Sequence, residues 1–520
     1  MRSRLFIAAI FLSIATFSTS AQAVDCHAIA KIALPDTTIL TAERVIGGSF
    51  TPPYGARLTE LPAFCRVSGI LHPTSDSVIR FEVWMPEKGW NHRFLGAGNG
   101  GFAGSIYYGQ LGENLKRGFA TAGTDTGHQG DAEDASWAYQ HPEKITDFGY
   151  RALHLTTERS KAIIHAFYGD PPTKSYFDAC SDGGREALME AQRFPADYDG
   201  ILAGAPANNW TRLISAGVDK TKVFLSDPAG YISSIKLPAI TAAVLAQCDV
   251  QDGLKDGILN DPRSCHFDPG TLLCKQGDEL TCLTRPQVAS LRKIYGGGTD
   301  DEGHIIFPGL MPGDEAHQWK SWVVGNGPGV SLYTQNYFRY MVFGDPSWNA
   351  LTANTDAALH AADAKTAQQL NATDPDLSRY AARGGKLILY HGWNDPAISP
   401  LNTIQYYEQV QAKMGDAKTA DFVRLYMVPG MGHCAGGQGA TSFGQLGLTT
   451  AKGQKYGIFD ALENWEEQNI APEAIIATKY DAAKKVAMTR PVCPYPQVAK
   501  YNGSGDPNDS AAFTCAAPGH

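Results

Sequence analysis

Short apolar runs rich in β-branched and aromatic residues alternate with longer helical patterns between residue 24 and about residue 207. The helical stretches 152–167 and 184–194 each place apolar side chains near one helical face. This alternation is typical of a mostly parallel sheet with crossover helices. The expected strands are residues 78–85, 93–96, 119–123, 175–179 and 200–203.

The alternation stops at residue 208 and resumes near residue 381. The intervening stretch is rich in Gly, Pro, Asp, Cys and clustered aromatic residues, and no internal repeat occurs. Beyond it, the pattern predicts strands at 386–390 and 422–428 and helices at 402–414 and 459–467. We therefore expect one α/β domain formed by residues 24–207 and 381–520, carrying residues 208–380 as an insertion.

The first 23 residues have the pattern of an export signal. Arg2 and Arg4 precede an apolar run, residues 5–17, and small residues surround the expected cleavage site after Ala23. An uncleaved membrane anchor is the alternative, but the run is short for a span, and no other apolar run approaches the roughly 20 residues needed. We expect an exported protein, periplasmic or secreted, that is not held in a membrane.

Composition excludes several classes of protein. Hydrophobic residues make up 43% of the 520-residue chain, which excludes intrinsic disorder. The net charge of -9 and the lack of a long basic run argue against a nucleic-acid partner. An even number of cysteines, ten, favours disulfides in an exported protein, and no CxxC pair or Cys/His cluster has the spacing of a zinc site. Oligomeric state is not readable from these patterns.

Ser181 lies between an expected strand and an expected helix, in the segment SYFDACSDGGREALMEAQRF. Ala179 and Gly183 flank it at two residues on either side, which gives a nucleophile elbow with alanine in place of the first glycine. Small residues are needed there because the serine backbone is strained and neighbouring chains pass close. Taken alone, the string also fits a capping or loop serine.

Two partners for this serine follow later strands. Asp395 comes just after one expected strand in KLILYHGWNDPAISP, and His433 comes after the next in FVRLYMVPGMGHC. The order Ser, Asp, His is that of α/β-hydrolases, whose catalytic side chains gather at the carboxyl ends of the strands. A turn-capping Asp and a loop His are the separate alternatives, but order and spacing together favour a triad.

Glycines are dense in GAGNGGFAG, residues 96–104, directly after an expected strand. An oxyanion hole needs one N–H from the residue after the nucleophile, here Asp182, and another from such a loop, for which we select Gly100 or Gly101. A phosphate-binding loop is disfavoured because no Lys follows with the right spacing. A flexible turn remains the other interpretation.

Cys180 precedes the candidate nucleophile and Cys434 follows the candidate histidine. If Ser181 and His433 meet, their neighbours come within the Cα separation of about 4.4 to 6.8 Å that a disulfide requires. We therefore predict a Cys180–Cys434 bridge that holds the two loops in register.

These motifs together resemble the tannase and feruloyl esterase family of α/β-hydrolases. The resemblance covers nearly the whole mature chain: the glycine loop, Cys180 and Ser181, the stretch QRFPADYDGILAGAPA, the insertion, Asp395, and His433 with Cys434. It implies that the insertion is a lid over the active site and that the Cys bridge links the catalytic serine and histidine loops.

Asp-rich sequence in the insertion, CDVQDGLKDGILNDPRSC, suggests a calcium site. The side chains of Asp249, Asp252 and Asp256 and the backbone carbonyls of Leu254 and Ile258 offer hard oxygen ligands on a short loop. The motif lacks the closing Glu of an EF-hand, and the resemblance implies a lid calcium here. An Asp-rich turn without an ion is the alternative.

Pairing the other cysteines by proximity gives Cys26–Cys65, Cys248–Cys265, Cys274–Cys282 and Cys493–Cys515. The resemblance supports this scheme, although sequence alone does not establish connectivity. Aromatic residues cluster between residues 319 and 348, and such side chains line ligand pockets or form a lid core. Candidate substrate contacts are Tyr337, Phe338, Arg339 and Trp348.

The combined interpretation is an exported serine ester hydrolase that acts on small aromatic esters. Feruloyl or related hydroxycinnamoyl esters are the first expected substrates. Gallate esters and the mono(2-hydroxyethyl) ester of terephthalate are alternatives, and serine peptidase activity would use the same residues. A noncatalytic, calcium-dependent module that binds polymers is the alternative from another class, and the complete triad argues against it.

Overall fold

The computed structural model describes residues 24–448, 450–451 and 457–518. The expected export signal, residues 1–23, lies outside the described residues. Within them, nine strands form one mixed sheet in the order β1-β4-β5-β7-β6-β8-β9-β12-β13. Strands from β7 to β13 in this order run parallel, whereas β1, β4 and β5 are antiparallel to their neighbours. The strands of this sheet are β1 (Thr37–Val45), β4 (Phe64–Leu71), β5 (Ile79–Pro86), β6 (Arg93–Ala97), β7 (Ala120–Thr124), β8 (Lys174–Cys180), β9 (Gly200–Gly204), β12 (Lys386–Gly392) and β13 (Val423–Val428).

Helices cover both faces of this sheet because successive strand residues are apolar on both sides. Leu387 and Leu389 pack in the cluster that contains α3, α4 and α12, whereas Ile388 packs in the cluster of α14. The helices of this part are α1 (Tyr108–Lys116), α2 (Pro142–Thr146), α3 (Ala152–Tyr168), α4 (Asp182–Arg193), α12 (Pro400–Met414), α13 (Asp416–Phe422) and α14 (Ile458–Gln468). Every strand and helix that the alternation predicts in this part of the chain is present, with its ends shifted by no more than about two residues.

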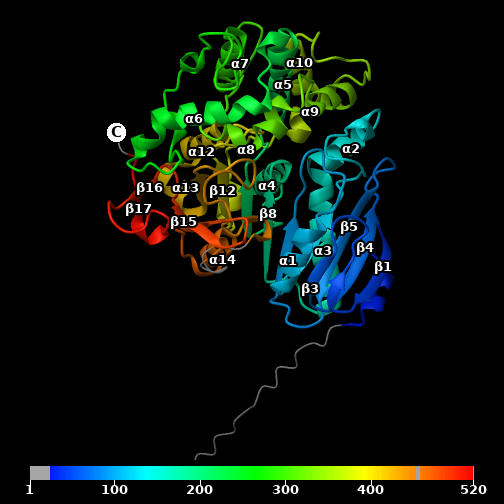
Figure 1. Ribbon diagram of the computed structural model, residues 1–520. Coiled ribbons are helices and arrows are strands. Elements are labelled where there is room, and N and C mark those ends of the chain that lie inside the picture. Colours follow the sequence, from blue (N-terminus) through cyan, green and yellow to red (C-terminus); the bar gives the residue numbers. More distant parts are fainter. Residues whose placement is uncertain (1–23, 449, 452–456, 519–520) are drawn as a thin grey trace, which may run out of the picture.

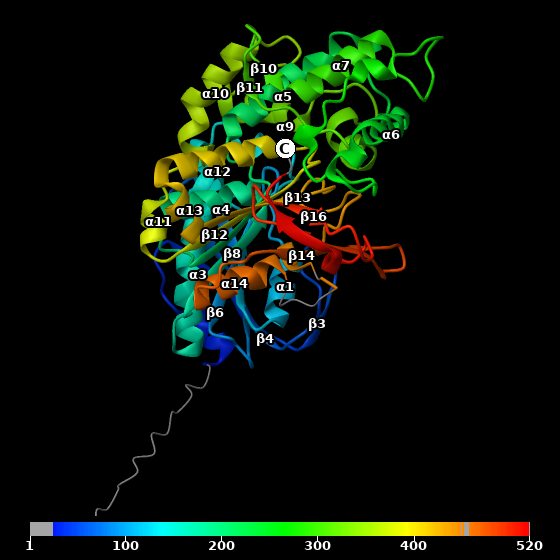
Figure 2. The same cartoon turned by 90° about the vertical axis from the view of Figure 1, so that its left-hand side faces the viewer.

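Most of the chain between β9 and β12 gathers at one end of the molecule, above the sheet, and only its last helix, α11 (Ser378–Ala382), returns to pack beside the sheet (Figures 1 and 2). The chain before α11 contains α5 (Trp210–Leu225), α6 (Leu237–Cys248), α7 (Arg285–Gly296), α8 (Glu315–Trp319), α9 (Leu332–Asn336) and α10 (Thr355–Leu370), with the hairpin β10 (Gly298–Thr299) and β11 (Ile305–Phe307). Its helices bury two apolar clusters, one around Trp210 and Phe338 and one around Ile240 and Trp319. We call this segment the cap.

One described stretch, Pro228–Asp252, is long and apolar enough to cross a membrane by length and composition alone. The expectation that no second run reaches that length is therefore corrected. The side chains of Leu237, Ile240 and Val244 on α6 are buried in the cap cluster, so the apolarity of this stretch has a use within the fold.

Three small antiparallel hairpins complete the chain. They are β2 (Gly48–Phe50) with β3 (Leu58–Leu61), β14 (Ile475–Tyr480) with β15 (Val486–Val492), and β16 (Val498–Tyr501) with β17 (Phe513–Ala516). The last two bring the C-terminal region beside the cap: Asn260 Nδ2 donates to the Ala499 carbonyl at 3.0 Å, and Arg490 forms an ion pair with Asp256 at 2.8 Å.

All ten cysteines are paired as predicted. The bonds are Cys26–Cys65, Cys180–Cys434, Cys248–Cys265, Cys274–Cys282 and Cys493–Cys515. Four of them close short loops of 8 to 39 residues, whereas the Cys180–Cys434 bond joins residues 254 apart in sequence.

Candidate active site

Ser181 occupies a sharp turn between β8 and α4. Its backbone has φ 69° and ψ -124°, a conformation that costs a non-glycine residue about 1–3 kcal/mol. Backbone hydrogen bonds hold it there: the Ser181 N–H donates to the Gly204 carbonyl at 3.0 Å, and its own carbonyl accepts from Ala207 at 3.1 Å. The turn therefore presents the hydroxyl at the carboxyl edge of the sheet.

Ala179 replaces the first glycine of the elbow pattern because two other glycines face it. A Cβ added at Gly98 or at Gly183 would lie 2.6 Å from the Ala179 Cβ, far inside van der Waals contact. The methyl group of Ala179 thus occupies the space that these two glycines leave. The pattern is altered, but the close packing of strand, glycine loop and helix is retained.

The three predicted triad residues meet. His433 Nε2 lies 2.9 Å from Ser181 Oγ, and His433 Nδ1 lies 2.7 Å from Asp395 Oδ2. Ser181 follows β8, His433 follows β13 and Asp395 follows β12, and the carboxyl ends of these parallel strands lie at the same edge of the sheet. In this arrangement, the imidazole can accept the Ser181 proton while Asp395 holds the other ring nitrogen protonated.

The Asp395 carboxylate is fully buried and has four hydrogen-bond donors. Oδ1 accepts from the backbone amides of Ala397 at 2.8 Å and Ile398 at 3.0 Å, and Oδ2 accepts from His391 Nε2 at 3.1 Å besides His433. Burial alone would raise the pKa of Asp395, but the charges of His433 and His391 and the hydrogen bonds from these two imidazoles hold it below its ordinary value. Asp395 is thus ionised and fixed in orientation.

His391 is a second buried imidazole in this network that sequence reasoning missed. Its Nδ1 lies 2.7 Å from Thr403 Oγ1, and its Nε2 also lies 3.1 Å from the Ile398 carbonyl. Since both Nε2 neighbours are acceptors, Nε2 carries the proton. Its spacing of four residues before Asp395 was the only available signal, and that spacing by itself is common.

A disulfide and a glutamine fix the loop that carries His433. The Cys180–Cys434 bond, with 6.0 Å between Cα atoms, joins the residues next to Ser181 and His433. From the cap, Gln318 Oε1 accepts from the His433 backbone N–H at 2.8 Å, and Gln318 Nε2 donates to the Ala435 carbonyl at 2.8 Å. The cap thus helps to position the histidine.

Backbone N–H groups suited to an oxyanion face the same space. Asp182 and Gly101 line the pocket, and neither backbone N–H has a hydrogen-bond acceptor among the described residues. Gly101 has φ +62°, and a Cβ there would lie 2.5 Å from the Ala132 carbonyl oxygen, so the turn requires glycine. Gly100 does not line the pocket and packs against Tyr107, so of the two glycine candidates Gly101 is the one placed at the pocket.

The side chain of Asp182 is held by a buried ion pair with Arg185. Arg185 Nε donates to Asp182 Oδ1 at 2.6 Å, and Arg185 Nη1 donates to the Gly149 carbonyl at 2.7 Å. The guanidinium lies 4.8 Å from the Phe148 ring and 5.4 Å from the Trp210 ring. This pair anchors the first turn of α4 and the Asp182 N–H with it.

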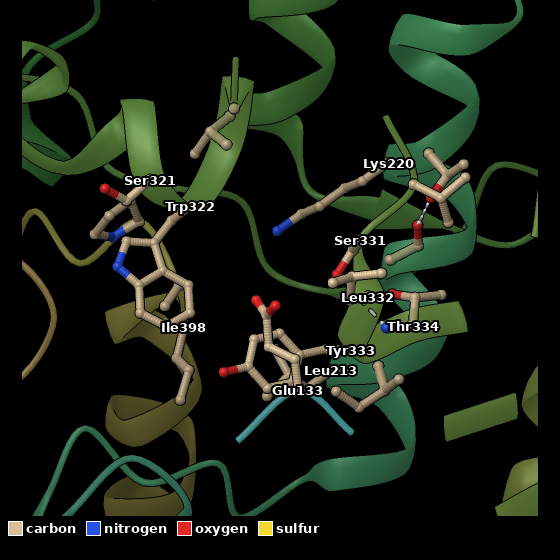
Figure 3. A pocket seen from close by; sticks show the side chains of 18 of the residues that line it. Glu133, Leu213, Lys220, Ser321, Trp322, Ser331, Leu332, Tyr333, Thr334 and Ile398 are labelled. Carbon is tan, nitrogen blue, oxygen red and sulfur yellow. Dashed lines mark hydrogen bonds between the residues drawn. The ribbon is translucent and has the colours of Figure 1, made fainter. Parts of the chain in front are cut away.

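A pocket of about 340 Å³ opens beside Ser181 and His433 and is lined mostly by side chains of the cap. Trp322 lies across the histidine, with ring centroids 4.9 Å apart and an interplanar angle of 70°. Tyr333, Leu213 and Ile398 point into the same space (Figure 3). Large apolar and aromatic walls beside a nucleophile suit an aromatic acyl group.

The four substrate contacts predicted from the aromatic cluster do not line this pocket, which corrects that prediction. Tyr337 and Phe338 are fully buried in the cap cluster, Trp348 stacks on Phe338 at 4.7 Å, and Arg339 Nε donates to the Trp348 carbonyl at 2.9 Å. These aromatic residues form the core of the cap. Trp322 and Tyr333, from the same sequence window, are the ones that reach the pocket.

The Asp-rich loop lies in the cap, next to the C-terminal hairpins. Asp249 accepts two hydrogen bonds from the Gly257 N–H at 3.0 and 3.1 Å, Asp252 accepts from Leu254 and Asn260, and Asp256 accepts from Ile258. Among the described residues only Asp256 has a cationic partner, Arg490. The loop therefore presents oxygen donors with excess negative charge, which is the donor chemistry that calcium prefers.

Comparison with known proteins identifies the family. A sequence model described as "Tannase and feruloyl esterase" matches residues 65–516, which is most of the chain. This chain belongs to the tannase and feruloyl esterase family. The expectation drawn from the motifs around Ser181, Asp395 and His433 is thereby confirmed, and the protein is a carboxylic ester hydrolase with an α/β-hydrolase fold.

Relatives of the family match this chain over nearly their full length. An uncharacterized esterase of Xanthomonas campestris pv. campestris is 43% identical over 96% of this chain and 92% of its own. A probable feruloyl esterase B-2 of Neosartorya fischeri is 35% identical over 93% and 94% of the two chains. The crystal structure of feruloyl esterase B from Aspergillus oryzae superposes with a TM-score of 0.88 at 30% identity, covering 94% of this chain and 99% of that one. Tannin acyl hydrolase from Aspergillus niger shares the fold, with a TM-score of 0.76 at 24% identity over 95% of each chain.

Proposed function

We propose that this chain hydrolyses esters of aromatic carboxylic acids through an acyl-enzyme on Ser181, with hydroxycinnamoyl esters such as ferulates as its first substrates. The observation that carries the proposal is the hydrogen-bonded series Ser181, His433 and Asp395, which opens onto a pocket walled by Trp322 and Tyr333. The names of the fungal relatives support the choice of acid.

The proposed reaction has two halves. His433 Nε2 takes the Ser181 proton as Oγ attacks the ester carbonyl, and the N–H groups of Asp182 and Gly101 donate hydrogen bonds that stabilise the negative charge on the carbonyl oxygen. His433 then gives its proton to the departing alcohol. In the second half, His433 takes a proton from water, which attacks the acyl-enzyme, and the acid leaves as Ser181 Oγ regains its proton.

The first test is Ser181→Ala. We expect it to abolish hydrolysis of methyl ferulate and of 4-nitrophenyl acetate while the circular dichroism spectrum and thermal midpoint stay unchanged. Retained turnover would remove Ser181 from the mechanism. Binding of a plant polymer by wild type without ester turnover would favour the noncatalytic binding module instead.

The second test ranks substrates. Comparing kcat/KM for ferulate, gallate and mono(2-hydroxyethyl) terephthalate esters separates the first proposed substrate from its two alternatives. A preference for gallate or for the terephthalate monoester would change the acid that we propose as the substrate's acyl group but would leave the proposed mechanism unchanged. Amide analogues of the best ester test peptidase-type cleavage in the same assay.

We also propose a structural calcium ion in the cap. It would be held by the carboxylates of Asp249, Asp252 and Asp256 and the backbone carbonyls of Leu254 and Ile258, and it would neutralise the excess charge of the loop. Calcium should raise the thermal midpoint of EDTA-treated protein, and Asp252→Asn should reduce that increase. Loss of rate on chelation without loss of stability would contradict a structural role.

Export is proposed from two features. The first 23 residues have the composition of a cleaved signal, and five disulfides are typical of a protein in an oxidising compartment. Expression of the full chain in a bacterial host, followed by N-terminal sequencing of the exported protein, tests this. A mature chain that begins at Val24 is the expected result.

A further inference from the structure

Lys220 extends into the active-site pocket from α5, toward the side where Trp322 lies (Figure 3). It lines the same cavity as Ser181 and His433, yet no hydrogen bond or ion pair among the described residues joins it to the triad. Its amine is therefore placed to contact a bound substrate at atoms other than the reacting carbonyl.

The amine of Lys220 has no hydrogen-bond or ion-pair partner among the residues that the structure describes. Its acidic neighbour Asp219 is engaged elsewhere, with Lys293 at 3.2 Å and the Thr299 N–H at 3.0 Å. By contrast, Lys222 on the same helix donates to Thr355 Oγ1 at 3.2 Å. Lys220 thus differs from Lys222, because its amine faces the cavity and makes no hydrogen bond or ion pair within the described chain.

The surroundings of this amine make an unpaired charge costly. The cavity walls include the apolar side chains of Leu213, Ile214, Phe224, Leu310, Val324 and Ile398, and the carboxylate of Glu133 and the hydroxyl of Ser331 project into the same space (Figure 3). Burial lowers the pKa of Lys220, although Asp395 and Asp219 act in the opposite direction. A cation in such surroundings gains most from a ligand that brings its own acceptor oxygen.

We propose that Lys220 determines specificity by binding an oxygen at the end of the acyl group remote from the ester: a phenolic oxygen or a carboxylate. This inference rests on the proposed function, because it assumes that an aromatic acyl group occupies the pocket. Both oxygen types are acceptors for an ammonium group, and the ring of the acid packs against the apolar walls between Ser181 and Lys220. Acids that lack a remote oxygen leave the amine unpaired and bind more weakly.

The test compares Lys220→Met, which keeps the length of the side chain but removes its charge, with Lys220→Arg and with Lys222→Met as the matched control on the same helix. Two substrate pairs isolate the remote oxygen: methyl 4-hydroxycinnamate against methyl cinnamate, and monomethyl terephthalate against dimethyl terephthalate. We expect Lys220→Met to lower kcat/KM roughly 10- to 100-fold for the better oxygen-bearing ester, mainly through KM. Methyl cinnamate should change less than about 3-fold, and Lys220→Arg should retain part of the preference.

The two pairs identify the source of the oxygen. A loss confined to the 4-hydroxycinnamate pair assigns Lys220 to a phenol, and a loss confined to the terephthalate pair assigns it to a carboxylate. An equal loss on methyl cinnamate, no loss on any ester, or the same pattern in Lys222→Met would overturn the proposal.

Inhibition by amides separates this proposal from the proposed function. Cinnamamide and 4-hydroxycinnamamide are tested against hydrolysis of 4-nitrophenyl acetate, so that no ester of an aromatic acid needs to be turned over. The hydroxyl group should strengthen inhibition of wild type and of Lys222→Met but not of Lys220→Met. If wild type hydrolyses no ester of an aromatic acid but shows this difference in inhibition, only the substrate assignment is refuted. If the two amides inhibit wild type equally, the role of Lys220 is refuted.

Discussion

Removing the Cys180–Cys434 bond should damage catalysis more specifically than removing any other disulfide. The bond closes a separation of 254 residues, for which the loop-entropy relation gives about 5.5 kcal/mol of stabilisation. The Cys274–Cys282 bond closes a separation of 8 residues, for which the same relation gives about 2.5 kcal/mol. Both pairs can be replaced by alanine.

The expected loss of rate follows from the position of the Cys180–Cys434 bond beside the catalytic serine and histidine. Cys180 and Cys434 adjoin Ser181 and His433, whose Oγ and Nε2 lie 2.9 Å apart, so release of the bond loosens that contact directly. Because a misplacement of about 1 Å in a catalytic contact costs on the order of 100-fold, we expect that loss in kcat for Cys180→Ala/Cys434→Ala. The Cys274→Ala/Cys282→Ala control should keep wild-type kcat.

The assay combines urea unfolding with initial rates on 4-nitrophenyl acetate, measured without denaturant on protein shown by circular dichroism to be folded. Titrating wild type with a reducing agent should likewise remove activity before the fold is lost. The reasoning is refuted if the Cys180/Cys434 double variant is folded and turns over substrate at the wild-type rate. It is also refuted if the control loses as much kcat.

Three further predictions concern buried groups and the cap. Arg185→Met should destabilise the fold by about 3–5 kcal/mol in urea unfolding, because it leaves the buried Asp182 charge unpaired; wild-type stability would contradict this. Burial raises the pKa of Asp178 to about 7, so its contribution to stability is complete below about pH 4 and is lost as pH rises to about 7. Asp178→Asn should therefore gain up to about 4 kcal/mol relative to wild type between pH 4 and pH 8, and parallel stability curves would refute the shift. Trp322→Ala should raise KM about 3- to 10-fold with little change in Tm, since the ring contacts His433 yet is 41% exposed; an unchanged KM would place the substrate elsewhere.

The spacing of apolar residues, and the turn-forming residues between the apolar runs, account for most of the fold prediction. The parallel strands are buried on both faces and read as continuous apolar runs, which is why β8, β9 and β12 were found with nearly correct ends. The C-terminal hairpins were not predicted: burial does not alternate along β14 and β15, and β16 and β17 have only four residues each. Short elements of that kind leave little periodic signal.

The residues of the candidate site also fall into two groups: those that the sequence predicts and those that it does not. Ser181, Asp395 and His433 were predictable because each follows a strand and their order is distinctive. Lys220 and Gln318 were not, because their roles depend on which wall of the folded chain they face. Aromatic density failed as a signal for substrate contacts, since a small cap needs the same residues for its own core as a pocket needs for its walls.

The neighbouring positions of β9 and β12 bear on how far this protein could be shortened. The two strands pair directly and in the same direction, so the excursion leaves at the carboxyl end of β9, beside Tyr390, and returns at the amino end of β12, beside Gly200, at the opposite edge of the sheet. Parallel neighbours cannot be joined by a tight turn; they need a right-handed crossover of a dozen or more residues. A minimised variant that keeps the sheet must therefore retain one helix of the excursion. It also needs another group to make the hydrogen bonds by which Gln318 holds the loop of His433.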